Sequence, residues 1–376
     1  MAEGIVRRLV VSAVNFTEGG PLSAFRDCLS VAASSLSDEW EIIALVHDRS
    51  LFDIPRVTFI EFSRSKRSWL CRLYHEFWTF DALSRKLNPD VWFSLHDISP
   101  RVHARKRVVY CHNPSPFYHP HIRESVWDPK FFLFTLLYRY LYRINIHSND
   151  FVIVQQDWIR KAFQRMYGIS DVVVAHPVMT ELPRDAQIIK SVGNVFFYPA
   201  LPRVFKNFEV ICDAAEILCK RIGNIFEVRL TISGSESRYT AYLKRRYAEV
   251  PVIRFIGLQS KEEMKTQYQE ASVLVFPSKL ETWGLPISEA IGWRKPLLVA
   301  DLPYAHETVG AYAHVNYFDP QNPVQLAELM DAHLKGTLCP QAKGYVSIAE
   351  PFAANWEELI RLVVAEPVNS YGAAKP

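Results

Sequence analysis

The stretch Val273–Glu307 reads VLVFPSKLETWGLPISEAIGWRKPLLVADLPYAHE. Its first four residues are apolar and fit a buried parallel strand that ends at Pro277, and a short polar loop with one glycine follows. Pro286 suits the first turn of a helix, where its missing N–H costs no hydrogen bond. The stretch therefore predicts a strand, a loop and a helix N-terminus, whose free N–H groups and partial positive charge favour an anionic oxygen.

Short apolar runs alternate with helical patterns over the whole chain of 376 residues. This alternation is typical of parallel sheets with crossover helices. Because the chain is longer than the ~250 to 300 residues at which a single core stops growing, we expect two domains. We predict an α/β protein with two facing Rossmann-like, doubly wound domains, and ligands of such domains bind at the carboxyl ends of the strands.

A polar stretch, MTELPRDAQIIKSVG at residues 179–193, interrupts this alternation and marks the domain boundary. We expect an N-terminal domain at residues 1–180 and a C-terminal domain at 194–350. Apolar residues at helical spacing between Phe352 and Val364 predict a closing helix at residues 351–366 that packs back toward the N-terminal domain.

Composition excludes several classes of protein. The chain is 49% hydrophobic and 22% charged, which indicates a folded globular protein, and its net charge of +3 is too small to indicate a nucleic-acid binder. The six cysteines form no C-x-x-C or Cys/His cluster, so we expect no structural metal. The apolar start of the chain contains Arg7 and Arg8, which favours a first buried strand over a signal peptide, and we expect a cytoplasmic protein.

Two glutamates flank the helix start predicted above. Glu281 lies in the loop, and we place Glu289 in the first helical turn. A carboxylate there can accept two hydrogen bonds from a vicinal diol such as a ribose. The alternative, which carries about equal weight for Glu289 taken alone, is that the carboxylate only complements the helix dipole.

The segment ETWGLPISE, Glu281–Glu289, resembles the E-x7-E motif of retaining GT-B glycosyltransferases of family 4, the glycosyl transferases group 1. The resemblance extends over roughly residues 194–331 and is weaker in the N-terminal half. It implies that Glu289 binds the nucleotide ribose and that Glu281 contacts hydroxyls of the donor sugar. It also implies that backbone N–H groups after Glu281 serve the sugar and the phosphates. These residues are Thr282, Trp283, Gly284 and Leu285.

Two cations lie at the start of another helix, which we expect Asn207 to cap. Arg203 and Lys206 follow a predicted strand and would neutralise a leaving diphosphate. They resemble the family's R-x4-K element, but Leu201 stands where the arginine belongs, so Arg203 is a substitute. Ser233 and Gly234 resemble the short turn that lines the nucleotide cleft in the family.

In the N-terminal half, the only Gly-Gly pair of the chain, Gly19 and Gly20, follows the first predicted strand. Glycines there allow the backbone to pass close to a ligand. The pair resembles the family's glycine loop, which faces the donor diphosphate and the acceptor. His112 ends another predicted strand and resembles the histidine that many members place near the anomeric carbon. A structural histidine is the alternative for His112.

Two further features concern the acceptor. His96 and Asp97 are expected to be exposed at a strand end, where they could contact an acceptor. Residues 1–178 hold 22 Lys and Arg against 18 Asp and Glu. Basic and aromatic segments at residues 64–69, 101–107 and 130–143 fit a surface that contacts anionic lipid headgroups. The alternative for Lys130–Arg143, to which we give equal weight, is a core helix with snorkelling arginines.

The resemblance implies a retaining glycosyltransferase that moves a hexose, with mannose from GDP-mannose favoured over a UDP-sugar donor, to a saccharide or lipid-linked saccharide acceptor in surface polysaccharide or O-antigen synthesis. No D-x-D motif occurs, so we expect no metal and no other cofactor, with cations and helix ends acting instead. We also expect peripheral contact with the inner face of the plasma membrane. The alternatives are a nucleotide-sugar epimerase or hydrolase of the same shape and a non-catalytic partner subunit.

Overall fold

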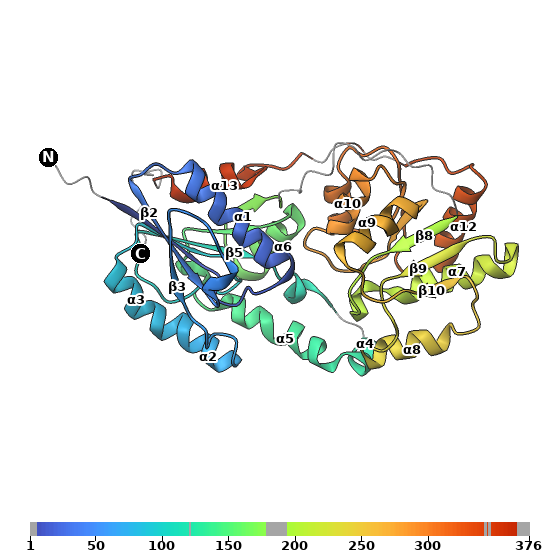
Figure 1. Cartoon of the computed structure of the whole chain (residues 1–376), viewed down its shortest axis with the longest axis horizontal. Coiled ribbons are helices and arrows are strands. Elements are labelled where there is room, and N and C mark those ends of the chain that lie inside the picture. Colours follow the sequence, from blue (N-terminus) through green and yellow to red (C-terminus); the bar gives the residue numbers. More distant parts are fainter. Residues whose placement is uncertain (1–5, 120–121, 178–193, 342–343, 345–346, 367–376) are drawn as a thin grey trace. The chain divides into compact units, whose positions relative to one another are not determined.

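The computed structural model of the protein describes residues 6–119, 122–177, 194–341, 344 and 347–366 (Figure 1). The chain divides into two compact units. The first contains residues 1–113, 137–178 and 348–376, and the second contains residues 114–136 and 179–347. Each unit has its own parallel sheet, so the predicted α/β class is confirmed. The predicted boundary at 179–193 lies outside the described residues.

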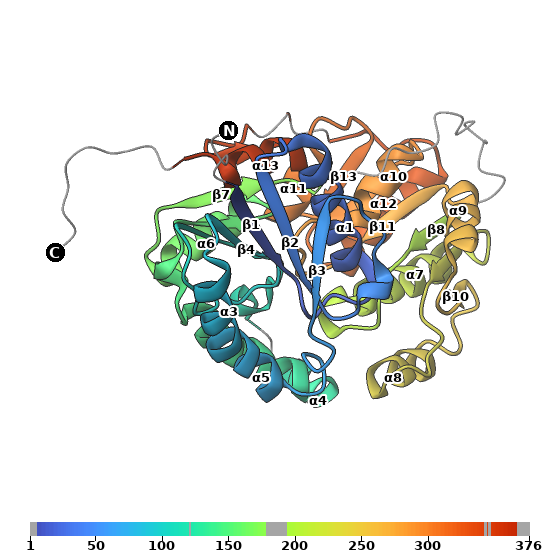
Figure 2. The same ribbon diagram turned by 60° about the vertical axis from the view of Figure 1, so that its left-hand side comes forward.

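The first unit contains an eight-stranded sheet in the order β14-β7-β6-β5-β4-β1-β2-β3, in which every described pair is parallel (Figure 2). Its strands are β1 (Arg7–Ser12), β2 (Trp40–Val46), β3 (Val57–Glu61), β4 (Val91–Ser94), β5 (Lys106–Cys111), β6 (Phe151–Val154), β7 (Val172–Ala175) and β14 (Phe352–Ala353). Strand β1 lies between β2 and β4. The chain passes from β1 to β2 and β3 on one side and returns to the other side of β1 with β4, so the strand order reverses between β1 and β4. Ligands of doubly wound sheets bind at such a switch point.

The helices of the first unit cover both faces of this sheet. They are α1 (Gly19–Ser35), α2 (Trp69–Tyr74), the π-helical segment η2 (His75–Thr79), α3 (Phe80–Leu87), α6 (Asp157–Tyr167) and α13 (Trp356–Val364). The helices α1 and α13, from opposite ends of the sequence, pack side by side over the core (Figure 1). The Lys106 ammonium group donates to the carbonyls of Leu362 and Ala365, both at 2.8 Å, and so holds the end of α13.

The closing helix begins later than predicted. The sequence places Phe352 in the helix, but Phe352 and Ala353 pair with β7 as an edge strand. The helix starts at Trp356 because the Asn355 side chain accepts a hydrogen bond from the backbone N–H of Glu358 and caps it.

The second unit contains a six-stranded parallel sheet in the order β10-β9-β8-β11-β12-β13, which repeats the 3-2-1-4-5-6 arrangement of the first. Its strands are β8 (Val195–Tyr198), β9 (Glu227–Leu230), β10 (Ile253–Phe255), β11 (Val273–Phe276), β12 (Leu297–Ala300) and β13 (Val315–Phe318). The switch point lies between β8 and β11. Its helices are α7 (Phe208–Ile222), α8 (Arg238–Arg246), α9 (Lys261–Glu270), α10 (Leu285–Gly292), α11 (Pro303–Val309) and α12 (Pro323–Leu334).

Residues 114–136, which the sequence analysis placed in the N-terminal domain, belong to the second unit. They include α4 (Ile122–Trp127) and the first half of α5 (Pro129–Arg143). Trp127 stacks on Tyr242 of α8 with ring centroids 4.4 Å apart, and Phe131 packs on Phe205 at 5.0 Å. These aromatic contacts hold the segment to the second unit, whereas the last half of α5 belongs to the first.

Candidate active site

An ion pair marks the switch point of the second unit. Lys206 lies in the loop after β8 and Glu281 in the loop after β11, and the Lys206 ammonium group bonds the Glu281 carboxylate directly. Their side chains are 15% and 13% exposed, so each keeps an accessible edge. The structure therefore brings together two of the residues that the sequence analysis selected, at the place where a doubly wound sheet binds its ligand.

Asn207 fixes the backbone beside Lys206. It has a left-handed φ of +58°, which asparagine tolerates better than most residues. The predicted role of its side chain as a helix cap is wrong. The Asn207 amide donates instead to the carbonyls of Pro277, at 3.1 Å, and Pro320, at 2.8 Å. The buried Tyr198 hydroxyl donates to the Lys206 carbonyl at 2.6 Å. The loop after β8 is thus tied to the end of β11.

The loop after Glu281 turns sharply into α10 at Gly284, whose φ is +86°. A Cβ atom there would lie 3.3 Å from Ile287 and 3.4 Å from Phe276, so conformation and space both favour glycine. The Trp283 side chain is buried, and its Nε1–H donates to the Ser288 hydroxyl at 2.9 Å. Only backbone groups of Trp283 and Gly284 are therefore suited to ligand contact.

Glu289 lies in the second turn of α10, one turn later than predicted, because the helix begins at Leu285. Its Oε2 accepts a hydrogen bond of 2.5 Å from the Tyr268 hydroxyl, and Tyr268 is 3% exposed. Burial raises the pKa of Tyr268, and the Glu289 charge raises it further, so the phenol remains a donor. This bond orients the carboxylate and leaves its other oxygen for a ligand.

The other predicted cation, Arg203, pairs with a different carboxylate. Arg203 is 58% exposed, and its guanidinium lies 3.6 Å from the Asp128 carboxylate. The sequence analysis missed Lys279, whose backbone N–H donates to the Phe205 carbonyl at 2.8 Å and whose ammonium lies 3.3 Å from Glu124. Its place between β11 and Glu281 was visible in the sequence, but a lone lysine in a loop carries no specific signal.

The backbone of the turn after β9 binds the carboxylate of Glu236, a residue of the same turn. The backbone N–H groups of Ser233, Gly234 and Ser235 donate to the Glu236 carboxylate at 2.5, 3.0 and 3.1 Å. Burial raises the pKa of Glu236, but hydrogen bonds from the backbone of Ser233 and Glu236 and from the side chains of Ser233 and Thr240 outweigh it and lower that pKa to about 2. A nest of N–H groups that holds a carboxylate is suited to anionic oxygens in general. The sequence analysis selected the turn but missed Glu236.

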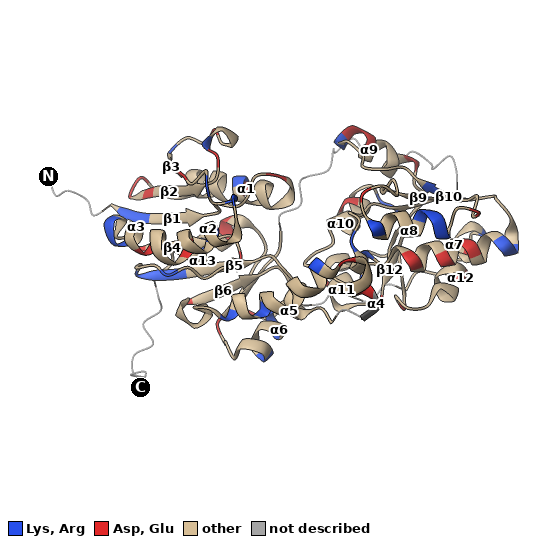
Figure 3. Cartoon of the chain, turned by 90° about the horizontal axis from the view of Figure 1, so that it is seen from below, with Lys and Arg blue, Asp and Glu red and all other residues tan. Residues whose placement is uncertain are grey.

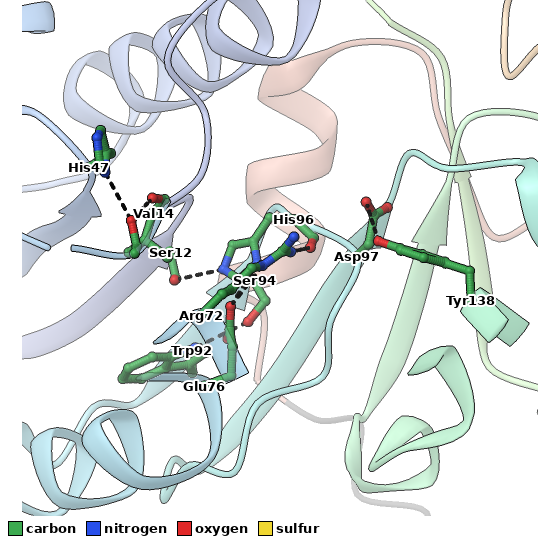
Figure 4. Close-up of polar contacts among 11 residues, drawn as sticks. Ser12, Val14, His47, Arg72, Glu76, Trp92, Ser94, His96, Asp97 and Tyr138 are labelled. Atoms are coloured by element: carbon green, nitrogen blue, oxygen red, sulfur yellow. Dashed lines mark hydrogen bonds and ion pairs between the residues drawn. The ribbon is translucent and has the colours of Figure 1, made fainter. Parts of the chain in front are cut away.

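A buried network closes the switch point of the first unit (Figure 4). The Ser12 hydroxyl at the end of β1 lies 2.9 Å from His96 Nε2 after β4, and both residues are fully buried. Arg72 Nη2 lies 3.2 Å from His96 Nδ1 and donates to the His96 carbonyl at 2.6 Å. Because arginine only donates, Nδ1 is an acceptor and Nε2 carries the proton. The predicted exposure of His96 is wrong.

Glu76 completes this network from the π-helical segment η2. Its Oε1 lies 3.1 Å from His96 Nδ1 and 3.7 Å from Arg72 Nε, and its side chain is fully buried. Burial raises the pKa of Glu76 to about 8 although the nearby Arg72 charge opposes the shift. Burial also lowers the pKa of His96, helped by the Arg72 charge. Near neutral pH the network therefore holds one positive charge, on Arg72.

His112 follows β5 in the first unit and packs between two rings. Its imidazole lies edge-on to Tyr110, with centroids 4.1 Å apart, and to Phe16, at 5.8 Å. Phe16 belongs to the loop that leads to Gly19, so the structure brings that loop and His112 together. Gln155 Nε2 lies 3.5 Å from Nδ1. Burial lowers the pKa of His112, so the imidazole is neutral near pH 7.

The two glycines of the predicted glycine loop, Gly19 and Gly20, differ. Gly19 begins α1 with a left-handed φ of +68°, which explains glycine at that position. A Cβ at Gly20 would contact nothing within 4 Å. The space beside Gly20 is therefore open, as a close backbone approach by a ligand requires.

Across the described ranges, no helix is both long and apolar enough to cross a bilayer. The same residues contain no group of three or more His, Cys, Asp or Glu side chains arranged to hold a metal ion.

The profile of the family described as "Glycosyl transferases group 1" matches residues 179–346. The chain is 21% identical over 208 residues to the O-antigen chain mannosyltransferase RfbU of Salmonella typhimurium, an alignment that covers 54% of this chain and 55% of the relative. It therefore spans about half the length of this curated relative.

Two solved structures resemble the fold over most of the chain. Sucrose-phosphate synthase from Thermosynechococcus elongatus matches with a TM-score of 0.65 at 15% identity, covering 88% of this chain and 90% of that one. WaaG, a glycosyltransferase involved in lipopolysaccharide biosynthesis, matches with a TM-score of 0.61 at 14% identity, covering 88% and 92%. The predicted GT-B fold is confirmed by these matches together with the two parallel sheets.

Proposed function

Residues 179–346 belong to the glycosyl transferases group 1 family, and on that premise we propose that the protein is a retaining, metal-independent hexosyltransferase of surface polysaccharide synthesis. Its donor is a nucleotide sugar, with GDP-mannose favoured over a UDP-sugar, and its acceptor is a hydroxyl of a saccharide or lipid-linked saccharide. The observation that carries the proposal is the Lys206–Glu281 ion pair at the β8/β11 switch point.

The pair suits a leaving nucleoside diphosphate. In the proposed reaction Lys206 balances the negative charge that grows on the leaving phosphate oxygen, which a fixed cation does without reorganisation. Glu281 holds the ammonium in place and accepts from donor-sugar hydroxyls. Glu289, oriented by Tyr268, accepts from the ribose diol. The N-terminus of α10, which Gly284 opens, offers N–H groups to the phosphates.

The proposed step retains configuration by displacement on one face of the sugar. The bond between the anomeric carbon and the phosphate oxygen breaks, and a bond to the acceptor oxygen forms. The acceptor proton passes to the leaving phosphate oxygen, so the step balances without an added base. We assign His112 to the donor sugar, where a neutral imidazole can exchange hydrogen bonds with hydroxyls. Cations and helix ends take the role of a metal.

Ligand binding and transfer test this function. The similarity of the chain to a mannosyltransferase supports the choice of mannose. We expect GDP to raise the unfolding temperature more than UDP does, because a ligand that binds only the folded state stabilises it. We also expect radiolabelled GDP-mannose to label a butanol-extractable saccharide lipid. Stabilisation by neither nucleotide would contradict the function, and release of free mannose without labelled lipid would favour a hydrolase.

An exposed apolar surface on the first unit supports membrane contact by the acceptor side. Its α2 and η2 residues are Trp69, Leu70, Tyr74 and Trp78, which are 49%, 79%, 60% and 62% exposed. Trp69 contacts Tyr138 of α5, with ring centroids 6.3 Å apart, and α5 adds exposed Leu137 and Tyr140. This helix contains no Asp or Glu and is mostly tan in Figure 3.

Lysine and arginine side chains accompany this apolar surface. Arg64, Lys66 and Arg67 are exposed just before α2. Each basic residue near an anionic membrane contributes about 1 kcal/mol, and aromatic side chains favour the interface. A buried core helix, the alternative for Lys130–Arg143, does not describe α5, because Leu133 and Leu137 are 54% and 56% exposed.

Vesicle binding tests this surface. We expect co-sedimentation with phosphatidylglycerol vesicles to increase with the anionic fraction and to decrease with salt, because the charge term fades beyond a Debye length of ~10 Å at 0.1 M. Leu70→Glu should weaken binding. The matched control is Leu258→Glu, since Leu258 is 81% exposed in the second unit. Equal binding by both variants would contradict the surface, and no binding by the wild type would indicate a soluble acceptor.

A further inference from the structure

Asp97 collects hydrogen bonds from two parts of the first unit. It directly follows His96 after β4 and has a φ of +72°, which non-glycine residues adopt rarely. Its Oδ1 accepts from the backbone N–H of His112 at 2.6 Å and of Asn113 at 3.1 Å. The Tyr142 hydroxyl lies 2.9 Å from the same oxygen. The Tyr138 hydroxyl donates to Oδ2 at 3.1 Å (Figure 4).

The two tyrosines come from the inner face of α5. Tyr138 and Tyr142 are one turn apart and are 4% and 0% exposed, whereas Leu137 and Tyr140 face outward from the same helix. Burial raises the pKa of both buried tyrosines, and the Asp97 charge raises each further. Both therefore remain protonated and can donate. The Tyr142 oxygen also lies 3.2 Å from the Asn113 N–H, so α5 and the turn after β5 interlock around one carboxylate.

This arrangement leaves Asp97 little capacity for a substrate. A carboxylate offers about four lone-pair sites, and four protein donors lie within 3.1 Å of them. Three of these donors lie against Oδ1 and one, Tyr138, lies against Oδ2. The contact with an acceptor that the sequence suggested for Asp97 would therefore have to use Oδ2. The strained backbone of Asp97 indicates that this geometry is held by its surroundings.

We propose that Asp97 is a positioning residue that sets the place and the protonation of the His112 imidazole by tying the turn after β5 to α5. The inference rests on the proposed function for its consequence in catalysis, since that function assigns His112 to the donor sugar. Asp97 acts through the His112 and Asn113 backbone and through its charge, which raises the pKa of His112 against the lowering by burial. Tyr110, Phe16 and Gln155 complete the surroundings of the ring.

The direct test follows the His112 imidazole by NMR in the full-length, histidine-labelled protein. We expect Asp97→Asn, which removes the charge and one acceptor oxygen, to lower the pKa of His112 and move its ring resonances. Tyr142→Phe removes one donor, keeps the charge and should also move the resonances. If Asp97→Asn does not fold, Tyr142→Phe still decides. Tyr167→Phe is the matched control, because the Tyr167 hydroxyl bonds Arg139 of α5 and does not bond Asp97.

Kinetics separate placement from catalysis. Misplacing a reacting group by about 1 Å can cost up to ~100-fold, so we expect Asp97→Asn to lower kcat for GDP-mannose by about tenfold to a hundredfold while KM changes little. Unmoved resonances in both variants, or movement as large in Tyr167→Phe, would overturn the proposal. Moved resonances with unchanged transfer in both Asp97→Asn and His112→Ala would support the placement and overturn the role of His112 in the proposed function.

Discussion

The two sheets share the 3-2-1-4-5-6 strand order, but the side chains at their switch points differ in burial. The carboxyl ends of β1 and β4 are joined by the contact between Ser12 and His96. Glu76 contacts the other nitrogen of His96, and all three side chains are fully buried. The buried network is closed to ligands, although Arg72 Nε and both carboxyl oxygens of Glu76 have no hydrogen-bond partner within it.

The carboxyl ends of β8 and β11 are joined by Lys206 and Glu281, which remain partly accessible. A partly accessible ion pair can exchange its partner for a ligand. The difference supports a structural role for the first switch point and, under the proposed function, ligand binding at the second.

The largest effect is expected from removing the Lys206–Glu281 ion pair at the second switch point. Lys206→Ala should lower kcat/KM by ~10² to 10³, the usual cost of one lost charge-stabilising donor. The unfolding temperature should also fall, because the pair is only 15% and 13% exposed and the loss of Lys206 leaves the Glu281 charge without its partner. The steady-state kinetics that measure the loss of activity are therefore compared at a temperature at which the variant is folded. Lys220→Ala is the control, since Lys220 also pairs with a glutamate but is 72% exposed on α7. Activity within a few-fold of wild type would shift the role to Arg203, Lys279 or the helix end.

The next effect concerns Glu289, the carboxylate that we propose binds the ribose. Glu289→Gln keeps the volume but removes the charge, and we expect weaker binding of the nucleoside diphosphate by ~1.5 to 3 kcal/mol, the value of charge-assisted hydrogen bonds. Calorimetric titration measures the affinity. Glu262→Gln, on the exposed first turn of α9, should bind as the wild type does. An unchanged affinity in Glu289→Gln would show that Glu289 only holds Tyr268.

The sequence predicted the second switch point better than the first, for a physical reason. Glu281, Gly284 and Glu289 lie within nine residues, so strand, turn and helix signals fix them locally. His96 was misjudged because its burial depends on Arg72 and Glu76, which are distant in the sequence and reach it only after folding. A polar residue at a strand end gives the same signal whether water or a helix covers it.

Two other features could not be predicted from local sequence patterns. The self-bound Glu236 depends on three consecutive N–H groups turning toward one carboxylate, which requires the left-handed φ of +88° at Gly234. The assignment of residues 114–136 to the second unit depends on aromatic contacts such as Trp127 with Tyr242, more than 100 residues away. Long-range contacts of this kind carry no periodic signal.

The third prediction tests the first switch point through pH. With a pKa of about 8 in the folded protein and 4.5 as the ordinary value, Glu76 stays protonated in the folded state while the unfolded chain ionises. The folded state then binds one more proton, so the free energy of unfolding falls as pH rises, until the pH passes about 8. Below pH ~6.5 the contribution of His96 to the free energy of unfolding rises with pH instead, because its pKa is lowered in the folded protein and the unfolded histidine takes up a proton there.

The useful window is therefore pH 6.5 to 8. Over this window the free energy of unfolding in urea should fall by ~2 kcal/mol more in the wild type than in Glu76→Gln, whose side chain cannot ionise. The expected slope is ~1.4 kcal/mol per pH unit for one proton. The cysteines titrate similarly in both proteins and cancel. Parallel curves for the two proteins would mean that Glu76 is ionised in the folded state and that the first switch point holds an ion pair too.

The last prediction is that a chelator has no effect on the transfer rate, and it concerns the second switch point. If Lys206 and the N-terminus of α10 stabilise the leaving diphosphate, a chelator should leave turnover unchanged, because a fixed ammonium and oriented N–H groups supply the charge that a divalent cation would otherwise supply. The measurement is the GDP-mannose transfer rate after dialysis against EDTA, with and without added Mg²⁺ or Mn²⁺. The Lys206→Ala variant is the informative partner: added Mg²⁺ can screen a diphosphate in solution, so partial recovery of that variant alone would confirm that its defect is missing positive charge. A wild-type rate abolished by EDTA and restored by Mn²⁺ would instead place a metal at the diphosphate, and Lys206 would then act mainly by holding Glu281.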